Sequence, residues 1–143
     1  MKLALKNLNT EFKPFGRILV PAGLSQLDTL DVGSFEFYVL FSERSSEWRI
    51  GYFVGFTGIV KSLERHPNTP EAFIPISGRP VLIVWSGSKD ASPSAFRLDK
   101  PAIILKGVWH NLASLDGESE VLIVENADVI DEVMELPDVL EIS

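Results

Sequence analysis

Short runs of apolar residues, separated by turn residues, constrain the fold of this chain more than any other feature. The runs are largely β-branched or aromatic, which favours strands. The separators combine glycine with small polar or charged residues, as in Val32-Gly33-Ser34, Ser77-Gly78-Arg79, Ser86-Gly87-Ser88 and Asp116-Gly117-Glu118. Strands at this spacing, without helical patterns between them, predict an all-β sandwich or barrel. The predicted strands are 17–20, 35–41, 48–56, 71–76, 80–85, 94–98, 101–106 and 120–125.

Helix is expected at only two places. In 127–135, Ile130, Val133 and Met134 would share one helical face, and Asp128 would suit the first turn. A shorter turn is expected at 9–12, capped by Asn9 or Thr10 and ended by Pro14. No repeat or linker divides the 143 residues, so we predict one domain spanning 1–143.

Composition excludes several classes of function. The chain has no cysteine, which excludes disulfides, thiolate nucleophiles and iron–sulfur clusters, and leaves His, Asp and Glu as metal ligands. The net charge is −7, and ten Asp or Glu residues but no Lys or Arg follow His110. Such a chain is a poor candidate for nucleic-acid binding. The start lacks a signal-peptide pattern and no run of eighteen apolar residues occurs, so we expect a cytoplasmic protein that does not bind membranes.

The side chains best suited to chemistry lie between Gly58 and Gly78. Glu64 and His66 are two residues apart, so they share one face if the segment is extended. Asn68-Thr69-Pro70 is expected to turn the chain and bring Glu71 back beside His66. His110, the only other histidine, would complete the set if 101–109 crosses the same cavity.

The spacing of Gly58, Glu64-Arg65-His66, Glu71 and Gly78 resembles the first motif of the cupins, with Glu64 in place of its first histidine. Gly107-Val108-Trp109-His110 resembles the second motif. A closer resemblance is to the ureidoglycolate lyase family, also described as ureidoglycolate hydrolases. It is carried by 63–67 (LERHP), 71–75 (EAFIP) and 107–110 (GVWH), with weaker similarity in 12–18 and 121–126. The resemblance implies a cupin-type double-stranded β-helix, or jelly-roll barrel, with little helix.

The resemblance also implies an activity. Members of that family release urea from ureidoglycolate and leave glyoxylate, a step in the use of allantoin in purine metabolism, and the family implies a homodimer. The chain departs from the family at Glu71, where glutamine is usual, and at Ile104 and Leu105, where a Tyr-His pair is usual. Leu105 also replaces a proline that is usual in the second cupin motif.

Ureidoglycolate is a carbinolamine that carries a carboxylate, so its collapse needs a base on the hydroxyl and an acid on the departing urea nitrogen. Glu71 or His66 would serve as the base, and His110 would donate the proton. Together with Glu64, these residues offer nitrogen and oxygen donors that suit Mn, Fe, Ni or Zn, so a divalent metal is the other use of the set. No organic cofactor is expected.

Arg65 or Lys106 would hold the substrate carboxylate, although strand alternation should turn Arg65 away from Glu64 and His66. Trp109 is expected in the core, with a contact to the substrate as a second role. Arg49 and Lys61 are expected to be surface charges. Two other functions stay open: a cupin that binds a small ligand or sugar without catalysis, and a metal-dependent cupin isomerase or dioxygenase.

Overall fold

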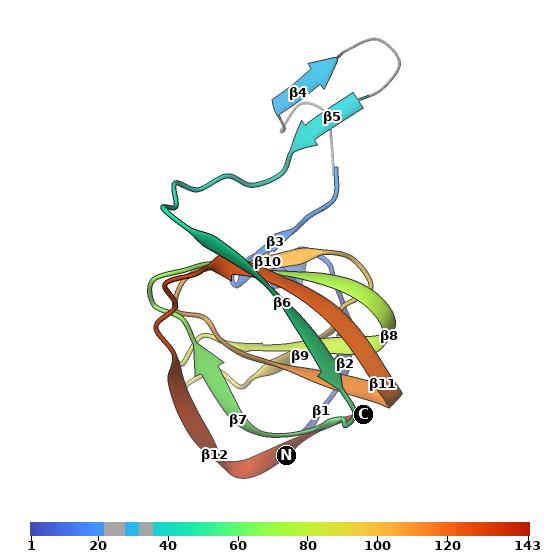
Figure 1. The fold of residues 1–143 in the computed structure, drawn as a ribbon. Coiled ribbons are helices and arrows are strands. Elements are labelled where there is room, and N and C mark those ends of the chain that lie inside the picture. Colours follow the sequence, from blue (N-terminus) through green and yellow to red (C-terminus); the bar gives the residue numbers. More distant parts are fainter. Residues whose placement is uncertain (22–27, 32–35) are drawn as a thin grey trace.

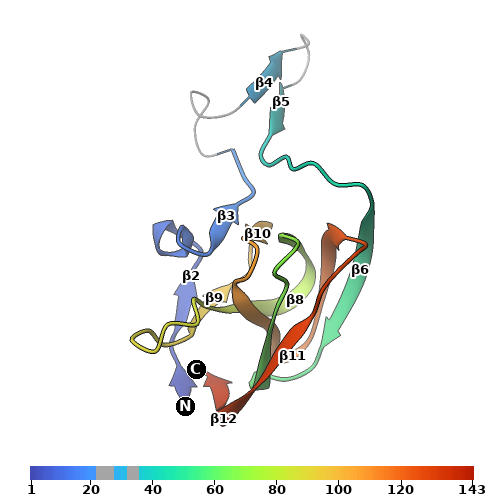
Figure 2. The same cartoon turned by 90° about the vertical axis from the view of Figure 1, so that its left-hand side faces the viewer.

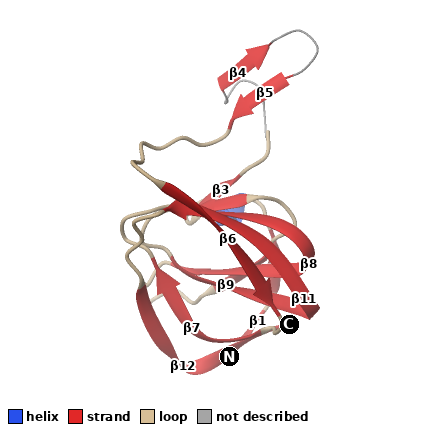
Figure 3. Ribbon diagram, viewed as in Figure 1, coloured by secondary structure: helices blue, strands red, loops and turns tan. Residues whose placement is uncertain are grey.

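The structure is a computed structural model that describes residues 1–21, 28–31 and 36–143, and nearly all of its regular structure is strand (Figure 3). The predicted turn at 32–34 lies outside the described residues. The strands are β1 (Lys2–Leu3), β2 (Leu5–Asn7), β3 (Gly16–Ile18), β4 (Asp28–Asp31), β5 (Glu36–Val39), β6 (Trp48–Gly55), β7 (Ile59–Arg65), β8 (Glu71–Trp85), β9 (Ser94–Arg97), β10 (Ala102–Ile104), β11 (Trp109–Asn126) and β12 (Glu132–Ile142).

Ten of these strands form one sheet that curls into a barrel (Figure 1). Its main path runs β1-β12-β7-β11-β8-β10-β3, while β6 pairs with β11, and β9 pairs with both β8 and β2. Strands β4 and β5 form a separate antiparallel pair that stands away from the barrel in both views (Figures 1 and 2). No helix in the described part of the chain is long and apolar enough to cross a membrane.

The two longest strands, β8 and β11, pair along their length and bend in the middle. The ladder runs from Trp109 opposite Trp85 to Glu125 opposite Glu71, with register shifts between Leu115 and Val121. At the bend, Gly78 has a φ of 75°, and a Cβ there would collide with the Glu118 carbonyl and Ser119. Only glycine tolerates both conditions easily. The predicted turns at 77–79 and 116–118 are therefore bends within long strands, and the predicted strands 71–76 and 80–85 are one strand.

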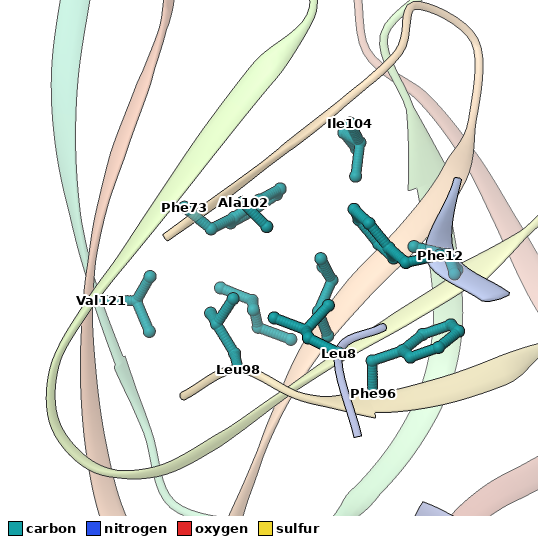
Figure 4. Close-up of a cluster of buried hydrophobic side chains, with 11 residues drawn as sticks. Leu8, Phe12, Phe73, Phe96, Leu98, Ala102, Ile104 and Val121 are labelled. Carbon is teal, nitrogen blue, oxygen red and sulfur yellow. The ribbon is translucent and has the colours of Figure 1, made fainter. Parts of the chain in front are cut away.

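The inward side chains of the bent strands fill the barrel with apolar groups, as their alternation requires. One cluster joins Phe73, Phe96, Leu98 and Val121 with residues of the N-terminal segment (Figure 4). A single 3-10 turn, Thr10–Phe12, places Phe12 edge-on against Phe96, at 5.4 Å between ring centroids. The side chain of Asn9 accepts a hydrogen bond from the Glu11 amide, which confirms the predicted short turn and its cap.

The predicted helix at 127–135 is wrong. Residues from Glu132 onward form β12, which pairs antiparallel with β7 from Glu132 opposite Arg65. Met134 packs against the core while Val133 is exposed, so the side chains follow the two-residue period of a strand. The spacing of Ile130, Val133 and Met134 fits a helix as well as a strand, and pairing with the edge of β7 decided between them.

Candidate active site

Two histidines and a glutamate meet inside one end of the barrel. Glu71 is the first residue of β8, His66 follows the end of β7, and His110 is the second residue of β11. Glu71 Oε2 lies 3.0 Å from His66 Nε2 and 2.8 Å from His110 Nε2, and the ring centroids of the two histidines are 5.1 Å apart. Each of the three residues is at most 5% exposed. The predicted convergence of His66, Glu71 and His110 is thus present in the structure.

The outer nitrogen of each imidazole is held by oxygen atoms. His110 Nδ1 lies 3.0 Å from the carbonyl oxygen of Val108. His66 Nδ1 lies 2.8 Å from Asp131 Oδ1 and 3.4 Å from the carbonyl oxygen of Ile130. Because a carbonyl oxygen only accepts, these contacts place a proton on Nδ1 and turn Nε2 toward Glu71.

The inner atoms of the site are close together without being paired in aligned hydrogen bonds. Among the described residues, four buried polar side-chain atoms have no hydrogen-bond partner, and three of them are Glu71 Oε2, His110 Nε2 and Glu125 Oε2. The contacts with Glu71 are therefore close charge contacts rather than well-directed hydrogen bonds. Buried donor atoms that converge in this way, on histidines whose outer nitrogens are held, are typical of residues that can ligate a metal.

Two overlapping sets of residues have the composition and spacing of metal ligands. Glu64, His66 and His110 form one set, and His66, Glu71 and Glu125 form the other; within each, one donor atom per residue lies within 4.8 Å of the others. The mixture of imidazole and carboxylate suits divalent transition metals. The donors therefore fit the divalent metal considered from the sequence.

Burial and neighbouring charges shift the pKa values of His66 and Glu71 in opposite directions. Burial lowers the pKa of His66, but the contact with Glu71 and the charges of Glu71, Glu125 and Glu64 outweigh it and raise that pKa to about 9. Burial raises the pKa of Glu71, but His110 and His66 outweigh it and lower that pKa to about 2. In the metal-free protein, His66 and Glu71 are therefore an imidazolium and a carboxylate at neutral pH.

The family follows from comparison with known proteins. A model of the ureidoglycolate lyase family matches residues 2–141. The chain belongs to the ureidoglycolate lyase family. The ureidoglycolate lyase of Brucella ovis is 33% identical over 131 residues, which cover 81% of this chain and 77% of that protein. The ureidoglycolate lyase of Rhizobium etli is 39% identical over 72 residues, covering 46% and 43% of the two chains.

A solved structure supports the fold. The capsular polysaccharide assembling protein CapF of Staphylococcus aureus superposes with a TM-score of 0.53 at 16% identity, over 77% of this chain and 32% of that chain. This likeness concerns the fold alone. With the strand topology, it confirms the predicted all-β cupin-type barrel.

Ile104 and Leu105, where the resemblance described above implies a Tyr-His pair, lie in different surroundings. Ile104 lies on β10 directly opposite Glu71 and is buried in the core, while Leu105 is exposed. This ureidoglycolate lyase family member therefore presents an apolar neighbour to Glu71, and its carboxylate is held by the two histidines.

The other predicted site residues lie at different distances from this centre. Glu64 Oε1 is 3.8 Å from His110 Nε2, so Glu64 borders the site. Arg65 donates to Glu132 at 2.6 Å, and its guanidinium lies 4.7 Å from the Trp109 ring centroid. Lys106 pairs with Glu43 at 2.8 Å. Arg65, Trp109 and Lys106 thus make contacts of their own outside the His66–Glu71–His110 cluster.

Sequence reasoning missed three residues near the histidines. Glu125 Oε2 lies 3.8 Å from His66 Nε2, and Arg49 donates to Glu125 Oε1 from Nε at 2.9 Å and from Nη2 at 2.6 Å. Asp131 holds the outer nitrogen of His66. The alternation of 120–125 could have turned Glu125 inward with Val121 and Ile123, whereas the placement of Arg49 and Asp131 depends on strand pairing and loop packing.

A cavity of about 600 Å³ lies on the outer face of the sheet, near the end of the barrel that holds the site. It is lined by Ala72, Ile103 and Val124 on the sheet, by 37–43, and by Pro70, Glu125 and Asn126 at the strand ends. Ala72, Ile103 and Val124 alternate with Glu71, Ile104 and Glu125 along their strands, so the cavity lies on the opposite face of the sheet from the histidines. Of the described residues around the histidines, only Glu125 also lines it.

Proposed function

We propose that this protein is a ureidoglycolate lyase that splits ureidoglycolate into glyoxylate and urea, with His66, Glu71 and His110 as its catalytic residues. Membership of the family supports the reaction, and the buried contact of one carboxylate with two imidazoles is the observation that supports these residues. Buried titratable groups with perturbed pKa values are characteristic of catalytic sites.

The reaction needs one proton removed and one proton supplied. Val108 accepts from Nδ1 of His110, so Nε2, which faces Glu71, is the ring nitrogen that would exchange a proton with the substrate hydroxyl. As the carbonyl of glyoxylate forms, the carbon–nitrogen bond breaks and its electron pair goes to the urea nitrogen. His66, flanked by Glu71 and Asp131, carries the proton that this nitrogen takes up. Glu71 holds both rings in place, so these roles differ from the sequence-based assignment, in which His110 was the acid.

A divalent metal fits the same donors, namely Glu64, His66, Glu71 and His110. When bound, it would polarise the hydroxyl or carboxylate oxygen of the substrate and lower the demand on a protein base. Metal binding requires a deprotonated His66, so loading would release a proton. Activity that survives a chelator would assign the chemistry to the side chains, whereas activity restored only by a divalent metal would assign it to the metal-loaded protein.

Glyoxylate release tests the lyase proposal. We expect the purified protein to release glyoxylate from ureidoglycolate faster than the spontaneous background, and His66→Gln and His110→Gln to lose most of this activity. Glu118→Gln, which changes an exposed carboxylate, is the control and should remain active. No release above background, with or without added divalent metal, would refute the proposal.

A non-catalytic cupin is the second candidate, and the apolar Ile104 beside Glu71 favours it, because a family tyrosine is missing there. It predicts that glyoxylate stabilises the protein against heat without any turnover of ureidoglycolate. The cytoplasmic location and the single domain remain predictions from the sequence.

We further propose that a second copy of the chain covers the outer face of β6, which makes the protein a homodimer. The β6 outer face consists of alternate apolar residues that are each at least 40% exposed, namely Trp48, Ile50, Tyr52, Val54 and Phe56. Aromatic side chains bury about 150–250 Å² each, so this face offers on the order of 600 Å². A stable interface needs roughly 800 Å² per partner, which flanking side chains would supply.

The free edge of β6 favours a second copy as the occupant. Among the described residues, β6 pairs with β11 only, so its other edge keeps unpaired backbone groups. Antiparallel pairing of β6 with itself across a two-fold axis would join these edges and place apolar residues against apolar residues. No charged residue lies between Ile50 and Phe56, so the paired β6 strands themselves would bring no like charges together.

Sedimentation tests this interface. We expect the wild type to sediment as a dimer at micromolar concentration and Tyr52→Lys to sediment as a folded monomer. Val133→Lys, which alters an exposed valine of β12, should stay dimeric. A monomeric wild type, or a dimeric Tyr52→Lys, would contradict the proposed interface.

A further inference from the structure

The substrate of the proposed reaction is an anion, yet the candidate site is surrounded by carboxylates. Glu64, Glu71, Glu125 and Asp131 each have an oxygen within 3.8 Å of a ring nitrogen of His66 or His110. A carboxylate that enters such a site loses its hydration and meets like charges, which is costly unless a cation faces it. The two ring nitrogens of His66 already face the carboxylates of Glu71 and Asp131, so the substrate carboxylate needs a further positively charged side chain.

The cations expected from the sequence are engaged elsewhere. Arg65 is bonded to Glu132 and lies over the Trp109 ring, and strand alternation places it on the opposite face from Glu64 and His66. Lys106 is paired with Glu43. In the described part of the chain, neither forms an ion pair with the carboxylates around the two histidines.

Arg49 lies in a row of side chains that leads into the site. It is opposite Glu125 in the pairing of β6 with β11, and Glu125 is opposite Glu71 in the pairing of β11 with β8. Partners in such pairs lie on the same face of a sheet, so Arg49, Glu125 and Glu71 share the inner face. The guanidinium of Arg49 donates two hydrogen bonds to Glu125 Oε1, while Glu125 Oε2 lies 3.8 Å from His66 Nε2. One buried carboxylate thus separates Arg49 from the histidine.

We propose that Arg49 binds the carboxylate of the substrate and that Glu125 is the positioning residue that holds its guanidinium. The inference rests on the proposed lyase function. Arginine has five N–H donors, and only Nε and Nη2 are used here among the described contacts, so Nη1 remains for a ligand. The Arg49 side chain is 52% exposed, whereas Glu125 is 7% exposed. The donor is therefore reachable from solvent, and the carboxylate beneath it fixes its position.

The reaction products provide the test, because glyoxylate carries a carboxylate and urea does not. We expect Arg49→Gln to raise the KM for ureidoglycolate and the inhibition constant of glyoxylate about ten- to hundredfold, the usual effect of losing a hydrogen bond to a charged group. The inhibition constant of urea should stay unchanged. Arg79→Gln is a matched control, since Arg79 is equally exposed and paired with Asp116 at the bend of β8.

Arg49→Gln leaves the buried Glu125 without its partner and could weaken binding through misfolding, so a second variant controls for this effect. The double variant Arg49→Gln with Glu125→Gln removes both charges, and it should fold and still bind glyoxylate weakly. If the wild type releases glyoxylate but both variants keep its KM and glyoxylate inhibition, Arg49 is not the carboxylate site. If the wild type releases none, the lyase proposal itself fails. Equal weakening of glyoxylate and urea inhibition would also overturn the assignment, because it would indicate general damage to the site.

Discussion

Replacing Glu71 by glutamine should destabilise the metal-free protein in a pH-dependent way. The fall in the Glu71 pKa from 4.5 to about 2 corresponds to about 3 kcal/mol of stability at pH values where the carboxylate is ionised and His66 is charged. The raised pKa of His66 arises from the same contact with Glu71, so its free energy is not added to the value for Glu71. Glutamine keeps the size of the side chain, so the loss should come from the charge.

The pKa shifts also set the pH window. Because the pKa of His66 is raised, its contribution is complete below about 6.5 and is lost as the pH rises through about 9. Because the pKa of Glu71 is lowered, its contribution is complete above about 4.5 and is lost as the pH falls through about 2. The difference in unfolding free energy between wild type and Glu71→Gln should therefore be greatest between about pH 4.5 and 6.5.

Urea unfolding in the presence of a chelator, followed by tryptophan fluorescence at pH 6 and pH 10, measures this difference. Glu118→Gln is the control, since Glu118 is exposed. The two histidines can also be titrated by NMR, and the pKa of His66 should fall in the variant. An equal loss of stability at both pH values, or an unchanged pKa of His66, would refute the reasoning.

Three further outcomes are expected. Gly78→Ala should unfold at a lower urea concentration than Gly107→Ala, because both have positive φ but only at Gly78 would a Cβ strike backbone atoms. Leu63→Ala, at a fully buried position, should lower the free energy of unfolding by about 2–5 kcal/mol, whereas Val133→Ala, at an exposed one, should change it by about 0.5 kcal/mol or less. Added Zn²⁺ or Mn²⁺ should raise the melting temperature of the wild type in calorimetry but not that of His110→Gln; equal shifts would exclude His110 as a ligand.

The sequence predicted the parts of the fold that depend on local chemistry. Apolar alternation and turn residues located most of the strands, and the Asn9 cap predicted the short turn. It failed where a glycine bends a strand instead of ending it, as at Gly78, because both arrangements use the same residue and the same positive φ. It failed again at 127–135, where strand pairing overrode a helical spacing.

The centre of the site was predictable because two motif spacings converge on it. His66, Glu71 and His110 come from these motifs, and the structure brings them within 3.0 Å of one another through Glu71. Arg49 and Glu125 are 76 residues apart, so no local spacing relates them. Their contact depends on the register between β6 and β11, which the sequence pattern does not specify.

The bend shared by β8 and β11 links distant positions mechanically. Glu71 and Glu125 lie at one end of this two-stranded ladder, and Trp85 and His110 lie near the other, yet Glu71 and His110 touch. The ladder therefore curls until its two ends meet at the proposed catalytic residues, with the bend at Gly78 between the two ends. We expect a substitution near Gly78 to change the bend and with it the distance between Glu71 and His110. Residues that never contact the substrate would then affect the size of substrate that the site accepts.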